Sequence, residues 1–221
     1  MNELLTVEHV TKTLGTVKAV NDVSLNVYEG EFLAIEGHSG SGKTTLLNLL
    51  SGLEQADAGK ITFGGKNITT MGEEELALFR RKNVGIVFQF FNLIPTLNVV
   101  ENIAFPLFPI KMPKTRMLDR ATEAAERFDL SHRLGHYPNE LSGGEQQRVA
   151  IGRALINDPK VVFADEPTGN LDTETGRKIL ELLKRLNKER GLTMVLVTHD
   201  DAIARESDRM IILKDGGIQN E

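Results

Sequence analysis

Residues 37–44, Gly-His-Ser-Gly-Ser-Gly-Lys-Thr, match the phosphate-binding pattern G-x-x-x-x-G-K-[ST] at every fixed position. In this P-loop, glycines let backbone N–H groups approach a phosphate, Lys43 can reach the terminal phosphates, and the Thr44 hydroxyl can bind Mg²⁺. An apolar, strand-like run at 32–35 precedes the loop and a helical pattern follows it. Because a helix N-terminus favours negative charge, the sequence predicts a nucleoside triphosphate site rather than a Gly/Ser-rich turn with an incidental lysine. The predicted phosphate-binding residues are Gly37, His38, Ser39, Gly40, Ser41, Gly42, Lys43, Thr44 and Thr45.

Two adjacent carboxylates, Asp165 and Glu166, follow the apolar run 161–164. Adjacent acids at a strand end can simply be surface charge. Beside bound phosphates they suit two tasks: Asp165 can hold Mg²⁺ through water, and Glu166 can orient or deprotonate an attacking water. The sequence therefore predicts hydrolysis, with Glu166 as the general base.

Gln89 and His199 each follow a predicted buried strand, at 84–88 and 193–198. A glutamine in such a place can cap a turn, and a lone histidine is usually structural. In an open α/β sheet, however, ligands bind at the carboxyl edge of the strands, where the P-loop and the two carboxylates also lie. We therefore expect Gln89 to reach the site and His199 to contact the γ-phosphate.

A second helix begins behind small residues, at Ser142-Gly143-Gly144. Its start has the same physical character as the P-loop and predicts another anion site. Taken alone the pattern is weak, because serines commonly cap helices. Asp172 is a predicted N-cap as well, for a helix with an apolar stripe that ends at Gly191.

The elements that must position these residues are typical of an α/β fold. Leu5, Val7 and His9, and then Val23, Leu25 and Val27, alternate with polar residues and predict half-buried antiparallel strands. Gly64-Gly65 predicts a hairpin turn, and residues 211–217 predict a closing hairpin. Between about 91 and 150 the strand–helix alternation stops and prolines break the chain, while residues 115–128 have a helical pattern. We interpret this region as an inserted helical subdomain.

Composition restricts the class of protein. A chain of 221 residues suits one α/β domain over 1–221, and the formal net charge of −5 argues against a dedicated nucleic-acid binder. With no cysteine there is no disulfide or thiolate chemistry. We expect no signal peptide, and no apolar run approaches the ~20 residues that cross a bilayer, so any membrane role needs a partner. Residues 90–97 are unusually apolar for a loop and are either core or a docking patch.

Together these residues resemble the ATPase domain of ABC transporters. The resemblance covers essentially the whole chain, and the signature segment 141–145 is highly specific for the class. Its finer features resemble the LolD/MacB branch, to which the cell-division protein FtsE is related. The motifs that match the family in order and spacing are the P-loop, Gln89, Leu141-Ser142-Gly143-Gly144-Glu145, Asp165-Glu166, Asn170-Leu171-Asp172 and His199. The segments that resemble the LolD/MacB branch are residues 88–95, residues 164–172 and the acidic stretch before Arg80-Arg81.

The resemblance implies a P-loop NTPase with a RecA-like core, an N-terminal antiparallel β subdomain and the inserted helical subdomain. It implies ATP and Mg²⁺ as cofactors, and a head-to-tail homodimer with each ATP between one P-loop and the partner copy's signature segment. It also implies an integral membrane permease, on whose cytoplasmic face the chain would sit. The alternative is an FtsE-like regulator of extracytoplasmic enzymes that transports nothing. The implied roles are catalysis by Glu166, His199 and Gln89, metal binding by Thr44, Gln89 and Asp165, and nucleotide contacts from Leu14, Ser142, Gly143, Gly144 and Asp172.

Three positions depart from the family pattern. Leu14 occupies the place of an aromatic residue that stacks on adenine, which predicts weak discrimination between ATP and GTP. Glu145 replaces the commoner glutamine. Gly152 stands where the signature helix usually has alanine, and because a glycine inside a helix costs roughly 1 kcal/mol, we expect a packing reason for it.

Overall fold

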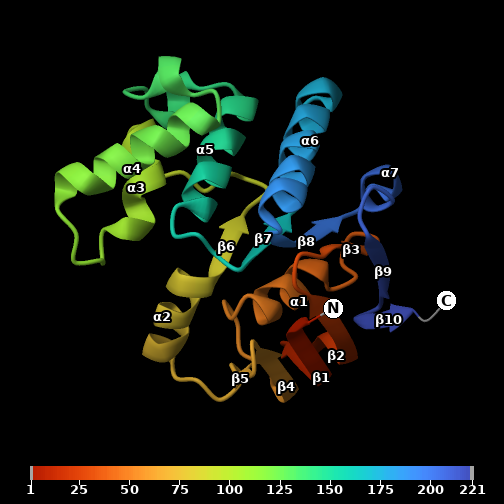
Figure 1. Ribbon diagram of the computed structural model, residues 1–221. Coiled ribbons are helices and arrows are strands. Elements are labelled where there is room, and N and C mark those ends of the chain that lie inside the picture. Colours follow the sequence, from red (N-terminus) through yellow and green to blue (C-terminus); the bar gives the residue numbers. More distant parts are fainter. Residues whose placement is uncertain (1, 220–221) are drawn as a thin grey trace.

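A six-stranded sheet brings the predicted strand ends to one edge (Figure 1). The computed structural model describes residues 2–219. Glu36 pairs with Thr198 and Asp165 with Val197, so the carboxyl ends of these parallel strands lie level with one another, as predicted. In spatial order the strands are β10 (Gly217–Gln219), β9 (Arg209–Lys214), β3 (Phe32–Glu36), β8 (Thr193–Thr198), β7 (Val161–Asp165) and β6 (Val84–Val87), parallel except for β10.

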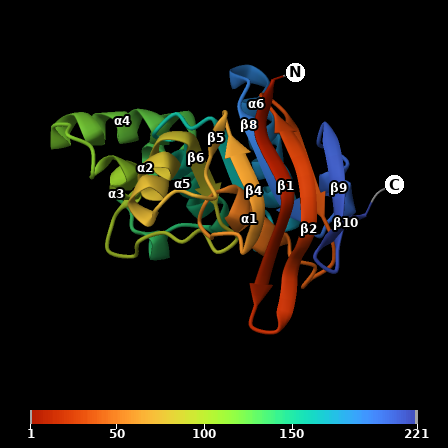
Figure 2. The ribbon, with the colours of Figure 1, turned by 90° about the horizontal axis from the view of Figure 1, so that it is seen from below.

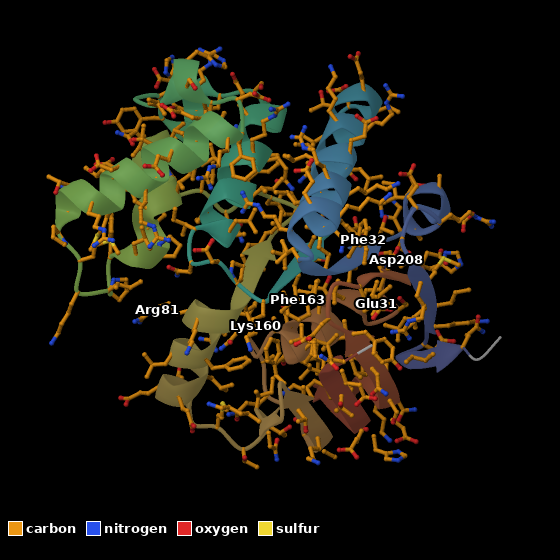
Figure 3. All side chains as sticks on the ribbon, in the orientation of Figure 1. Glu31, Phe32, Arg81, Lys160, Phe163 and Asp208 are labelled. Atoms are coloured by element: carbon orange, nitrogen blue, oxygen red, sulfur yellow. The ribbon has the colours of Figure 1, made fainter. Side chains whose placement is uncertain are left out.

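Strand β7 is buried on both faces and contributes to two hydrophobic cores. Phe163, labelled in Figure 3, is fully buried with helix α1 (Lys43–Leu50) and the N-terminal sheet. Val162 and Ala164 pack instead with α6 (Thr173–Arg190) and the helices inserted between β6 and β7. This double burial explains why the strand is an unbroken apolar run rather than an alternating one.

The N-terminal antiparallel sheet is confirmed, but one predicted position in it is wrong. The register of the first two strands shifts between Val7 and Val10, where His9 has a positive φ of 51° and an exposed side chain. This irregularity turns Val10 inward in place of His9. Figure 2 shows the long β1–β2 hairpin on the side away from α3 and α4. The strands, in spatial order, are β2 (Val17–Tyr28), β1 (Glu3–Leu14), β4 (Ala58–Phe63) and β5 (Lys66–Asn67), the last two joined at Gly64-Gly65.

The region between β6 and β7 is helical. The helix expected at 115–128 is α4 (Lys114–Arg127), and the helix behind the signature serine is α5 (Gly143–Leu155). The boundaries of a subdomain at 91 and 150 remain an expectation. The other elements are α2 (Glu73–Asn83), α3 (Val99–Ala104), α7 (Asp201–Ala204) and the 3₁₀ helices η1 (Phe105–Leu107), η2 (Ser131–Arg133) and η3 (Pro138–Glu140). Within residues 2–219, no helix has the length and apolar character needed to span a bilayer.

Close packing accounts for Gly152. A Cβ at this position would lie 3.2 Å from Cδ1 of Ile103 on α3 and 3.3 Å from Cδ2 of Phe128. Both distances are shorter than ordinary van der Waals contact, so an alanine would force the two side chains apart. The glycine lets α5 approach α3 closely, which offsets its cost inside the helix.

Candidate functional site

The P-loop joins β3 to α1 and folds around its own lysine. Nζ of Lys43 donates to the carbonyl oxygens of Gly37 at 2.7 Å and His38 at 2.9 Å. Gly42 has a φ of 100°, and a Cβ there would lie 2.0 Å from the carbonyl oxygen of Ala19 on β2. Only glycine fits this conformation and this close approach. The loop is therefore fixed in shape by its own chain.

The N-terminal end of α1 fits an anion. No side chain caps this helix, and its first turn carries no acidic residue. Oγ of Ser41 is buried and has no hydrogen-bond partner among residues 2–219. Because buried polar groups are normally paired, the free backbone donors and this hydroxyl suit the phosphates of a nucleotide.

Thr44 and Asp165 form a pair of oxygen ligands beside the P-loop. Oγ1 of Thr44 donates to Oδ1 of Asp165 at 3.3 Å. Burial raises the pKa of Asp165, as does the charge of Glu166, while the Thr44 hydrogen bond and the charge of Lys43 work in the opposite direction. A half-buried carboxylate facing a hydroxyl is a suitable donor set for Mg²⁺, which prefers oxygen ligands and would offset the cost of burying that charge.

Glu166 and His199 form a close carboxylate–imidazole pair at the ends of β7 and β8. Nδ1 of His199 lies 2.9 Å from Oε1 of Glu166, whose side chain is 19% exposed against 61% for the imidazole. Glu166 has a φ of 42°, an uncommon conformation for a residue other than glycine. The sequence predicts both residues at this edge but gives no sign that they touch. The pairing holds the carboxylate in place without burying the histidine.

Gln89 lies beside this pair. Its backbone oxygen accepts a hydrogen bond from Nδ2 of Asn170 at 2.8 Å. A Cβ on Gly169 would lie 2.9 Å from Nε2 of Gln89 and 3.3 Å from Oε2 of Glu166, so the two side chains lie on the same side of this glycine. The structure thus places Gln89 with the residues predicted to be catalytic.

The signature segment belongs to a different part of the surface. A Cβ on Gly143 would lie 3.1 Å from Leu171, and one on Gly144 would lie 2.6 Å from Thr175, so this helix end packs against the start of α6. There Asp172 caps α6 by accepting from the backbone N–H of Thr175 at 3.0 Å, as predicted. The nearest neighbours of the two signature glycines are therefore not P-loop residues.

Glu145 closes the N-terminal end of α5 from within. Ser142 accepts from the backbone N–H of Glu145, and Oε2 of Glu145 accepts from that of Ser142 at 2.8 Å, which makes a capping box. Oε1 of Glu145 lies 2.8 Å from Nε of Arg133 and 3.3 Å from Nε2 of His132. Burial acts against the charge, but the Ser142 N–H and Arg133 outweigh it and lower the pKa of Glu145 to about 2. The sequence gives no signal for Arg133 and His132, which lie more than ten residues earlier.

Leu14 lies next to the turn of the β1–β2 hairpin, paired with Val17. Both are exposed, at 47% and 64%. The same hairpin reaches the P-loop through Ala19, which the backbone of Gly42 approaches closely. Together the two side chains offer an apolar surface without an aromatic ring, and Val17 was not singled out from the sequence.

An apolar groove of about 520 Å³ separates the sheet edge at β6 from the inserted helices. Of the apolar run that begins at Phe90, Phe90 itself is 73% exposed, while Leu93 packs partly against the core and Ile94 lines the groove. Core packing is thus found for Leu93, whereas a docking role for the exposed part of this run stays a prediction. The groove's principal lining residues are Leu53, Phe88, Ile94, Phe105 and Phe108, with Arg80, Arg81 and Arg153 as its basic members.

Comparison with known proteins gives a consistent result. The family described as "ABC transporter" matches residues 20–169. The lipoprotein-releasing system ATP-binding protein LolD of Cytophaga hutchinsonii is 42% identical, over 99% of this chain and 100% of that protein. The macrolide export ATP-binding/permease protein MacB of Rhodopirellula baltica is 46% identical, over 88% of this chain but 29% of its own length. The dimeric post-hydrolysis structure of the cassette MJ0796 bound to ADP and Pi superposes with a TM-score of 0.90, at 43% identity and covering 98% and 97% of the two chains.

Proposed function

The chain belongs to the ABC transporter family and is an ABC ATPase, and from this premise we propose that it drives a membrane permease of the lipoprotein-release or macrolide-export type. The observation that carries the ATPase activity is the grouping of the Glu166–His199 pair with Thr44–Asp165 beside the uncapped end of α1. The type of permease is supported by the similarity to LolD and MacB.

In the proposed mechanism the P-loop amides, Ser41 and Lys43 bind the phosphates of ATP. Thr44, Asp165 and Gln89 would hold Mg²⁺, which when bound supplies positive charge against the β- and γ-phosphates. Glu166 accepts the proton of the attacking water. Nδ1 of His199, 2.9 Å from Oε1 of Glu166, holds this carboxylate in place, and Nε2–H on the other side of the ring can donate a hydrogen bond to the transferring phosphoryl group.

The active unit in this proposal is a homodimer with two ATP molecules. Each ATP would lie between one P-loop and the Ser142-Gly143-Gly144 segment of the partner copy. Two facts support it: the signature glycines contact α6 rather than the P-loop of their own chain, and the similar cassette MJ0796 is described as dimeric. We expect the chain to carry no nucleic acid.

The permease would dock in the groove beside β6, which places the chain on the cytoplasmic face of the membrane. Phe105 and Phe108 meet edge to face in this groove, with ring centroids 5.6 Å apart, and are 45% and 44% exposed. Exposed aromatic pairs of this kind serve as anchors for a partner helix. Arg80 and Arg81 at the groove suit acidic residues on that helix.

The test is co-purification with the permease, using two variants that each place a charge on an exposed apolar residue. Phe108→Asp should abolish binding of the permease and its stimulation of ATP hydrolysis, while basal hydrolysis stays within about twofold, because the groove does not contact the phosphates. Leu78→Asp is the matched control: Leu78 is 59% exposed on α2 and does not line the groove. Equal loss in both variants would place the docking site elsewhere. A complex that hydrolyses ATP but extrudes no substrate would favour the FtsE-like regulator.

A further inference from the structure

The loop that carries Gln89 has an unusual backbone. Phe91 and Asn92, two and three residues after Gln89, have φ values of 60° and 47°. Left-handed residues other than glycine are uncommon, and two in succession require something that holds them. The loop's internal hydrogen bonds, Phe91 N–H to the Phe88 oxygen at 3.2 Å and Asn92 N–H to the Phe90 oxygen at 2.6 Å, span only its own turn.

Arg153 of α5 supplies that support. Its Nη2 donates to the carbonyl oxygen of Phe91 at 2.7 Å, and its Nη1 donates to the carbonyl oxygen of Asn92. The planar fork of the guanidinium binds both oxygens at once, which a lysine cannot do with the same geometry. Arg153 is half-buried, and burial lowers its pKa, so the guanidinium is partly desolvated where it donates to these two carbonyls.

The position of Arg153 joins three functional parts. It lies in the last turn of α5, whose first residue follows Ser142, about 16 Å away along the helix axis. It lines the groove that we assign to the permease, together with Asn92. The loop that it holds begins at Gln89, whose side chain lies near Glu166. A movement of α5, or of a partner helix bound in the groove, would therefore displace the Arg153 side chain and the loop to which it donates.

We propose that Arg153 is a positioning residue that fixes the backbone after Gln89, and so sets where the Gln89 side chain meets Glu166 and the γ-phosphate. Through it, movement of α5 and occupation of the groove change the rate of hydrolysis. The link to the groove rests on the proposed function, whereas the positioning of the loop does not. Without the guanidinium the two left-handed residues relax toward extended backbone, and Gln89 moves with them.

Two arginines of the same helix make the test specific. Arg148 also donates to a backbone carbonyl, that of Phe128 at 3.1 Å, and to Asp129 at 2.7 Å, but it does not touch the Gln89 loop. We expect Arg153→Met to lower kcat about tenfold with ATP affinity within twofold, Arg153→Lys to recover part of the loss, and Arg148→Met to change kcat less than twofold. Hydrogen exchange at residues 89–94 should rise in Arg153→Met and not in Arg148→Met.

A double-mutant cycle separates positioning from folding. If Arg153 acts through Gln89, Arg153→Met should cost less than twofold in a Gln89→Ala background, while Arg148→Met has the same effect in both backgrounds. Fully additive losses, or an Arg153→Lys variant with wild-type kcat and wild-type exchange at residues 89–94, would overturn the proposal. Should Arg153→Met fail to fold, Arg153→Lys carries the same cycle. A wild-type chain without ATP hydrolysis would refute the proposed function, and the exchange experiment would still decide the role of Arg153.

Discussion

Helices α1 and α5 both begin behind glycine and serine, but their N-terminal ends are completed differently. At α1 the cap is Gly42, without a side-chain hydrogen bond and without an acid in the first turn. At α5, Ser142 caps the helix, and the carboxylate of Glu145 binds back to the Ser142 N–H. One end is left for a ligand to complete. The other is already occupied by its own side chains.

The difference shows why glycine and serine at a helix start do not by themselves define an anion site. The dipole and free N–H groups are common to both ends, but at α5 the Ser142 hydroxyl accepts from the Glu145 N–H and the Glu145 carboxylate accepts from the Ser142 N–H. An ATP phosphate that reaches Ser142 from a partner copy must therefore share this end with Glu145. Of these two ends, we expect the α1 end to bind phosphate without a competing side chain among residues 2–219.

The largest expected effect comes from a variant that traps ATP between the α1 end of one copy and the α5 end of the partner copy. Glu166→Gln should keep ATP binding and slow hydrolysis roughly 10²-fold or more, the usual contribution of a general base. ATP and Mg²⁺ should then accumulate a dimer in which the α1 end of one copy faces the α5 end of the other. Size-exclusion chromatography with and without nucleotide measures this. Near-wild-type turnover would show that Glu166 is not the base. A variant that stays monomeric with ATP and Mg²⁺ would show that the α1 and α5 ends do not bind the same ATP.

A smaller effect is expected at the N-terminal end of α1, which has no side-chain cap. Ser41→Ala should weaken ATP binding about tenfold or more, because a hydrogen bond to a charged group contributes roughly 1.5 kcal/mol or more. The nucleotide-free chain should lose no stability, since the Ser41 hydroxyl has no partner there among the described residues. Titration with a fluorescent ATP analogue and urea unfolding provide the two measurements. Lost stability with unchanged affinity would mean that this end, too, is completed internally.

At the N-terminal end of α5, which Ser142 and Glu145 cap, a substitution should change stability rather than ATP affinity. Ser142→Ala removes the cap of α5 and should lower the free energy of unfolding by about 1 kcal/mol, the typical cost of such a loss. Binding of the ATP analogue to the monomer should stay within about twofold, since the signature glycines pack on α6 and not on the P-loop. Urea unfolding and the same titration check both. A monomer that binds ATP many-fold more weakly would make the two ends parts of one site.

The smallest effect is electrostatic. The pKa of Glu145 is lowered from 4.5 to about 2 in the folded chain, so its contribution to stability is present above pH 4.5 and is lost as the pH falls toward 2. Glu145→Gln should therefore be less stable than wild type at pH 6, by under about 1 kcal/mol after solvent screening, and this difference in unfolding free energy should narrow at pH 3. Urea midpoints at the two pH values measure it. A gap that does not change with pH would mean that packing, rather than charge, holds this end closed.

Much of the site could be predicted from the sequence because it depends on strand ends. The P-loop, Asp165 and His199 each follow a buried apolar run, and parallel strands bring such positions to one edge. The helical pattern of residues 115–128 likewise predicted α4. These predictions need only local pattern and the geometry of a parallel sheet.

The features that escaped prediction depend on contacts between distant segments. The irregularity at His9 is a register shift of one residue, which the alternation of polar and apolar residues does not reveal. The Glu166–His199 contact joins the ends of two strands, and Gly152 is explained by the close approach of Ile103 and Phe128. Side-chain distances of this kind follow from packing, not from spacing along the chain.

Strand β7 has a consequence for how the molecule comes apart. Its alternate side chains, Phe163 on one face and Val162 and Ala164 on the other, belong to both cores. Unfolding of either core exposes one apolar face of β7. The inserted helices and the part of the chain that holds the P-loop should therefore unfold in a single cooperative transition. An excised fragment holding only the helices would lack the strand that anchors them, and proteolysis should remove them only after global unfolding.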